Sequence, residues 1–68
     1  MMNKFLGLGW NEAIEEIKKQ GRIYEIDQEP TTELCGCIKV STKYEGAYLI
    51  FDENAKVECY EFIGYHYD

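Results

Sequence analysis

The sequence predicts an α+β fold: one N-terminal amphipathic helix packed on one face of a three- to four-stranded antiparallel meander. The hydrophobic period changes at Gly21 from helical spacing to strand alternation. The 68 residues suffice for one domain only, and contents of 46% hydrophobic and 15% aromatic residues argue against disorder. We therefore expect residues 1–68 to form a single small domain with one core between helix and sheet.

The helix is expected at about residues 10–20. Acidic residues come early in this stretch and lysines late, which complements the helix dipole. Gly21 follows as the residue that ends the helix. We expect residues 1–9 to form a short strand or an irregular lead-in. The apolar stripe falls at positions i, i+3, i+4 and i+7, namely Trp10, Ala13, Ile14 and Ile17.

Strands are expected at about residues 22–26, 34–41, 46–51 and 55–62. Pro30 and the polar residues around it exclude a central strand and predict a loop over residues 25–33. The first strand therefore lies at an edge, and the other three follow in the order of the chain.

Alternation fixes the register of the two expected hairpins, because a slip of one residue inverts the faces. A loop at residues 42–45 pairs Val40 with Ala47, Ile38 with Leu49, and Gly36 with Phe51. A loop at residues 52–54, with Asn54 in the left-handed region, pairs Phe51 with Ala55, Leu49 with Val57, and Ala47 with Cys59. These residues form the inner face against the helix, where Gly36 makes room for the Phe51 ring.

The outer face of the expected sheet is more apolar than a solvated face needs to be. A partner-binding patch is expected there, because tyrosine supplies contact area and a hydroxyl at low entropy cost. The alternative is that residues 1–9 or 64–68 fold over this face. The patch consists of Cys37, Tyr48, Ile50, Tyr60 and Phe62.

Acidic residues give the chain a net charge of −6, from 13 carboxylates against 7 basic residues. This charge disfavours direct nucleic-acid binding and favours partners with basic surfaces. Four carboxylates cluster in an acidic surface segment, and every-second-residue spacing resembles the step between phosphates, so the segment is either a nucleic-acid mimic or a solvated loop. They are Glu25, Asp27, Glu29 and Glu33.

No metal or cofactor site is expected. Cys35, Cys37, Cys59 and His66 could supply zinc ligands, but the C-x-C spacing is poor and the register turns Cys59 to the opposite face. A redox pair is disfavoured because Glu33 lies beside these thiols and no helix N-terminus does. The glycines at residues 7 and 9 lack the full phosphate-binding pattern.

Enzyme activity is not expected, because the only histidine, His66, lies near the end of the sequence and has no oriented partner. The odd number of cysteines and the lack of an apolar leader or a membrane-spanning stretch predict a cytoplasmic protein.

A non-enzymatic, acidic, protein-binding module is therefore the expected function. Small size, acidity and the lack of a cofactor are typical of inhibitors of nucleic-acid-handling proteins carried by phages or mobile elements. The alternative is a homodimeric structural or regulatory domain that uses the same tyrosine-rich face. A small-molecule sensor would need a pocket that so small a core scarcely provides.

Overall fold

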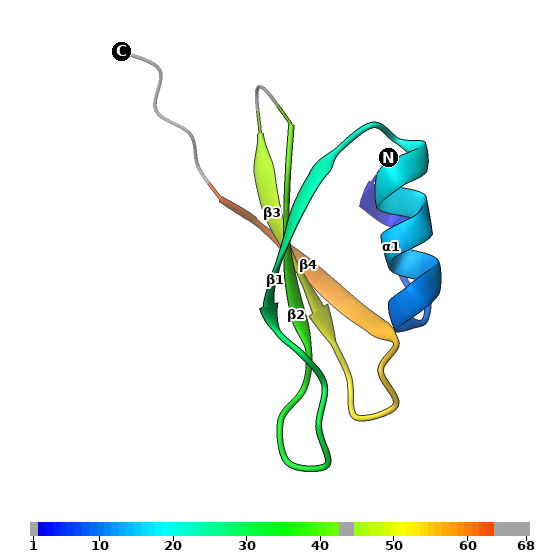
Figure 1. The fold of residues 1–68 in the computed structure, drawn as a ribbon, viewed down its shortest axis with the longest axis vertical. Coiled ribbons are helices and arrows are strands. Elements are labelled where there is room, and N and C mark those ends of the chain that lie inside the picture. Colours follow the sequence, from blue (N-terminus) through cyan, green and yellow to red (C-terminus); the bar gives the residue numbers. More distant parts are fainter. Residues whose placement is uncertain (1, 43–44, 64–68) are drawn as a thin grey trace.

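A computed structural model describes residues 2–42 and 45–63. Its elements are η1 (Met2–Phe5), α1 (Trp10–Lys19), β1 (Ile23–Gln28), β2 (Cys37–Ser41), β3 (Gly46–Phe51) and β4 (Val57–Ile63). The strands form one antiparallel sheet in the order β1-β2-β3-β4, and α1 and η1 lie on the same side of it (Figure 1). The predicted α+β fold is confirmed.

Helix α1 begins and ends as its sequence dictates. The Glu12 carboxylate accepts a hydrogen bond from the Gly9 N–H at 2.9 Å, which satisfies a donor at the helix start. Gly21 has a positive φ of 70°, and the Arg22 N–H donates to the Ile17 carbonyl at 3.0 Å. This left-handed glycine turns the chain directly into β1.

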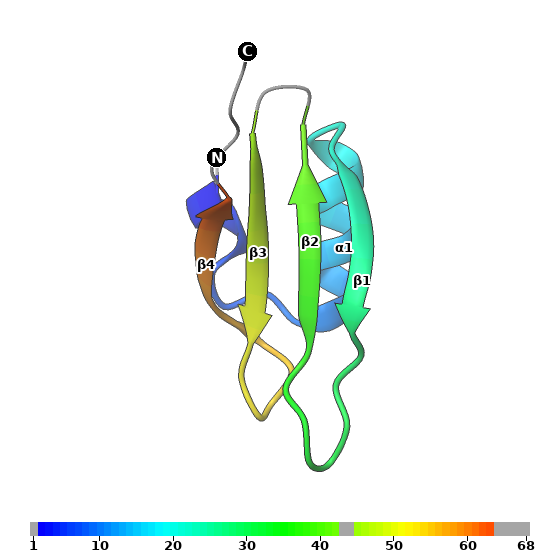
Figure 2. The same ribbon diagram turned by 90° about the vertical axis from the view of Figure 1, so that its left-hand side faces the viewer.

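The core lies between the sheet and its two helical elements. In Figure 2, α1 runs behind β1 and β2, whereas η1 lies behind β4. The lead-in forms a short 3-10 helix, and its Phe5 side chain is fully buried. The largest fully buried side chains are Phe5, Phe51, Ile17, Ile38, Leu49 and Val40.

The predicted β2–β3 register is confirmed, with Val40 opposite Ala47 and Ile38 opposite Leu49. The interpretation of Gly36, however, needs correction. A Cβ at Gly36 would lie 2.8 Å from Cζ3 of Trp10, so the neighbouring Trp10 ring needs the space rather than Phe51. That indole packs in turn against Phe51, with ring centroids 4.8 Å apart.

The predicted β3–β4 register is wrong. Ala55, not Asn54, occupies the left-handed region, with φ of 59°. The Asp52 N–H donates to the Lys56 carbonyl at 2.8 Å, so the turn is shifted by one residue. Phe51 then pairs with Val57, but Ile50 pairs with Cys59, which leaves Glu58 as the extra residue of a β-bulge.

This bulge exchanges the two faces of β4 beyond Glu58. Cys59 joins the outer face, whereas Tyr60 and Phe62 turn to the helix side opposite Leu49 and Ala47. The Tyr60 hydroxyl donates to Oδ1 of Asn3 at 2.7 Å, and its ring packs on the core. Phe62 meets the Tyr60 ring edge-on at 5.5 Å and remains 61% exposed. The expectation that Tyr60 and Phe62 share the outer face is therefore corrected.

Candidate protein-interaction face

One face of the sheet is not covered by a described helix, because α1 and η1 both lie on the other side (Figure 1). We call it the uncovered face. Strand pairing arranges its residues in three rows that run from β1 to β4. The rows are Ile23–Ser41–Gly46–Ile63, Glu25–Lys39–Tyr48–Glu61 and Gln28–Cys37–Ile50–Cys59.

Apolar side chains occupy the middle of the uncovered face. Cys37, Tyr48 and Ile50 come from the central strands β2 and β3, and all three are half-buried. These three residues of the predicted patch lie together, whereas Tyr60 and Phe62 lie on the helix side. The uncovered face extends onto both edge strands through three residues that alternation in the sequence did not place in the patch, namely Cys59, Ile63 and Ile23.

Carboxylates border this apolar middle on both edges of the sheet. Glu25 lies on β1 and Glu61 on β4, with Lys39 and Tyr48 between them in one row. The negative charges of Asp27 on β1 and of Glu61 both interact with the Cys37 thiol, so both carboxylates lie near it. The uncovered face thus combines half-buried apolar groups with three carboxylates and one ammonium group.

The acidic segment is only partly the loop that the sequence predicted. Glu25 and Asp27 belong to β1, while Glu29 and Glu33 lie in the connection that follows, and all four are exposed. A register shift between Ile26 and Gln28 interrupts the regular two-residue spacing at Asp27. Half of the segment therefore lies on a strand and borders the uncovered face.

The pKa of the Cys37 thiol is raised above its ordinary value of 9.0. Burial contributes most, because it disfavours the charged thiolate, and the negative charges of Asp27 and Glu61 add to the shift. A thiol with a raised pKa is a poor nucleophile at neutral pH. The structure thus favours a packing role for this cysteine.

We expect iodoacetamide to alkylate Cys37 more slowly than a free thiol at pH 8, in a Cys35→Ser/Cys59→Ser background. Asp27→Asn with Glu61→Gln should speed the reaction, because removal of the two negative charges lowers the thiol pKa. The rate measured against pH by mass spectrometry checks this. An unchanged profile in the double carboxylate variant would contradict the electrostatic assignment.

Metal ligands do not cluster in the part of the chain that the structure describes: no three of its His, Cys, Asp or Glu side chains could hold an ion together. The three cysteines are free thiols. Cys59 lies on the same face as Cys37, contrary to the predicted register, yet Ile50 stands between them in the row. His66, the fourth candidate zinc ligand, lies outside the described residues.

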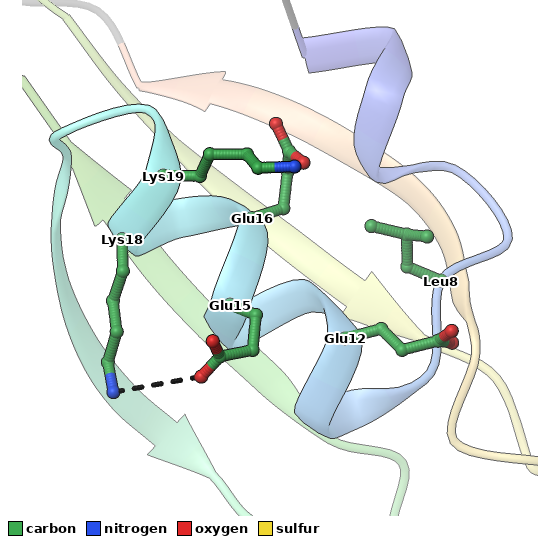
Figure 3. Close-up of a pocket in the computed structure, with 6 residues that line it drawn as sticks. All are labelled: Leu8, Glu12, Glu15, Glu16, Lys18 and Lys19. Carbon is green, nitrogen blue, oxygen red and sulfur yellow. Dashed lines mark ion pairs between the residues drawn. The ribbon is translucent and has the colours of Figure 1, made fainter.

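An open hollow of about 640 Å³ runs along α1 beside Leu8 (Figure 3). Charged side chains line it, and two of them pair with each other across 3.9 Å, from Lys18 Nζ to Glu15 Oε2. Glu16 accepts a hydrogen bond from Gln20 at 2.8 Å. We interpret this hollow as a solvated helix surface, because its acids and Lys18 have local partners.

No helix among the described residues is long and apolar enough to cross a membrane. No protein-family model, no curated protein and no solved structure matches the chain. The function must therefore be inferred from the geometry of the uncovered face.

Proposed function

We propose that the protein is a non-enzymatic, acidic binding module of the cytoplasm that covers a basic surface of a partner protein with its uncovered face. The observation that supports this most is the distribution of charge around apolar groups. Cys37, Tyr48 and Ile50 form the middle, while Glu25 and Glu61 border it from the two edge strands. Such a face offers apolar contact area between two edges that carry carboxylates, which favour lysine and arginine on the partner.

The partner that fits this face best is a protein that handles nucleic acid. Such proteins present lysine and arginine to phosphates, and the net charge of −6 would draw the chain to the same basic groups. Occupation of that surface would exclude the nucleic acid, which makes the chain an inhibitor of the kind carried by phages or mobile elements. The acidic segment contributes further negative charge beside this surface.

A homodimer through the same face is the alternative, supported by the apolar row of Cys37, Ile50 and Cys59. Two copies placed face to face would bring carboxylates of like charge together at both edges, which disfavours this arrangement. Solution mass separates the two: a monomer at micromolar concentration agrees with the inhibitor, and a stable dimer that buries Tyr48 favours the alternative.

The double variant Tyr48→Ala/Ile50→Ala should weaken binding to the native partner by roughly tenfold or more, because it removes the central contacts of the face. The partner is first captured from the native host's lysate and identified by mass spectrometry, and its affinity is then measured by calorimetry. Phe62→Ala is the matched control, since this exposed aromatic residue lies on the helix side. Equal losses in both variants would contradict the proposed surface.

A further inference from the structure

Strand β1 is an open edge of the sheet. In the described ranges, it pairs with β2 alone and lies at the end of the strand order. The other edge strand, β4, is partly occupied: the Val57 N–H donates to the Leu8 carbonyl at 2.8 Å, and the Gly7 N–H donates to the Val57 carbonyl at 2.9 Å. Among the described residues, by contrast, no segment outside the sheet bonds to the backbone of β1, so this edge is open along its length.

Two hydrogen bonds fix which backbone groups of the sheet point toward this edge. The Thr42 N–H donates to the Glu45 carbonyl at 2.7 Å, and the Phe51 N–H donates to the Gly36 carbonyl at 2.9 Å. Bonding direction alternates along an antiparallel strand. The even-numbered residues of β2 therefore bond to β3, and its odd-numbered residues, including Lys39 and Ser41, bond to β1.

The same alternation determines in which direction the backbone N–H and C=O groups of β1 point. Ile23 and Glu25 are opposite Ser41 and Lys39, so their backbone groups bond to β2. The N–H and C=O groups of Tyr24 and Ile26 consequently point away from the sheet. This edge offers two donors and two acceptors to an incoming strand.

The side chains of β1 specify which strand would fit. Tyr24 packs against the core and Ile26 is 41% exposed, and both lie on the helix side, where an incoming apolar residue would cover them. Glu25 and Asp27 lie on the uncovered face, where incoming lysine or arginine would pair with them. An extended segment that alternates apolar and basic residues meets both requirements.

A second copy of β1 does not meet them. Antiparallel pairing of two β1 edges would bring the carboxylates Glu25 and Asp27 of each copy close together on one face, and like charges on paired strands are destabilising. The irregularity at Asp27 also shortens the edge. Both features oppose self-association while they leave the edge open to a basic strand.

We infer that the partner docks by adding an extended segment of alternating apolar and basic residues to the β1 edge, an inference that rests on the proposed binding of a basic protein. The added strand extends the uncovered face by one strand. Backbone hydrogen bonds to Tyr24 and Ile26 supply the alignment, and Glu25 and Asp27 supply the selection for positive charge.

The test uses the full chain and a synthetic eight-residue peptide that alternates valine and lysine. Addition of this peptide to the isotope-labelled protein should shift the backbone amide signals of Tyr24 and Ile26 in the nuclear magnetic resonance spectrum. Methylation of the backbone nitrogens of the valines in the peptide should weaken binding by roughly tenfold or more, because those N–H groups face β1. Methylation of the backbone nitrogens of the lysines is the matched control. It should leave the affinity nearly unchanged, because these N–H groups point away from β1.

Equal binding of all three peptides, with signal shifts at Tyr48 and Ile50 instead, would overturn strand addition and leave the binding of a basic partner by the uncovered face intact. A peptide that binds nowhere on the chain would also overturn strand addition. Failure of the proposed function is recognised separately, by a native partner whose affinity is insensitive to Tyr48→Ala/Ile50→Ala.

Discussion

Phe51→Ala should bring the chain close to its unfolding midpoint at room temperature. The Phe51 side chain is fully buried on the helix side of β3 and packs against the indole of Trp10. Removal of a buried phenylalanine ring costs about 3–5 kcal/mol, which is comparable to the whole stability of about 5 kcal/mol at the low end for small domains. Far-ultraviolet circular dichroism and urea titration measure the loss.

The matched control is Phe62→Ala, because Phe62 is the same residue type on the same side of the sheet but 61% exposed. Its truncation should lower the free energy of unfolding by no more than about 1 kcal/mol, most of it from the lost contact with Tyr60. Similar losses in the two variants would show that the core does not lie where the structure has it.

Gly36→Ala is the second substitution with a large expected effect. The added Cβ would lie 2.8 Å from Cζ3 of Trp10, 3.0 Å from Cδ of Pro30 and 3.3 Å from the carbonyl oxygen of Gln28. The two rings are rigid, and the Trp10 ring is held against Phe51, so the contact cannot relax cheaply. Overpacking of this kind costs about 1–3 kcal/mol, which a lower urea midpoint would report.

A double-mutant cycle with Trp10→Leu isolates the cause. Leucine removes the ring atom nearest to the added methyl group, so Gly36→Ala should cost less in the Trp10→Leu background than in the natural chain. Strictly additive losses would assign the effect of the substitution to the contacts with Pro30 and Gln28 rather than to the Trp10 ring.

The sequence predicted the elements whose signals are local. The spacing of Trp10, Ala13 and Ile17 and the glycine at residue 21 define α1, and the cap geometry agrees with them. The β2–β3 register was also predictable, because its loop is short and only one pairing places apolar residues on a common face.

The β3–β4 register was not predictable, because a side-chain contact within the turn overrides the residue preferences on which the sequence prediction relied. The Asp52 carboxylate accepts hydrogen bonds from the N–H groups of Asn54 and Lys56 at 2.8 and 3.0 Å, which holds Ala55 in a conformation that propensity assigns to asparagine or glycine. Val57 in turn bonds to the lead-in segment, since its N–H donates to the Leu8 carbonyl at 2.8 Å, a contact that the local sequence does not signal.

The same bulge separates the site residues whose face was predicted correctly from those whose face was not. Cys37, Tyr48 and Ile50 precede it, and the sequence grouped them as the structure does. Tyr60 follows it and reaches the helix side, where its hydroxyl binds Asn3, a contact across 57 positions that no local pattern signals. Cys59 takes the place on the uncovered face that the sequence assigned to aromatic residues.

The bulge at Glu58 decides which side chains of β4 belong to the uncovered face, on which the proposed function depends. Cross-strand nuclear Overhauser effects between Hα protons test it directly, since these protons approach closely only in non-hydrogen-bonded antiparallel pairs. The structure predicts strong effects from Leu49 to Tyr60 and from Ala47 to Phe62. Strong effects from Leu49 to Val57 and from Ala47 to Cys59 would contradict it and return Tyr60 to the outer side of the sheet.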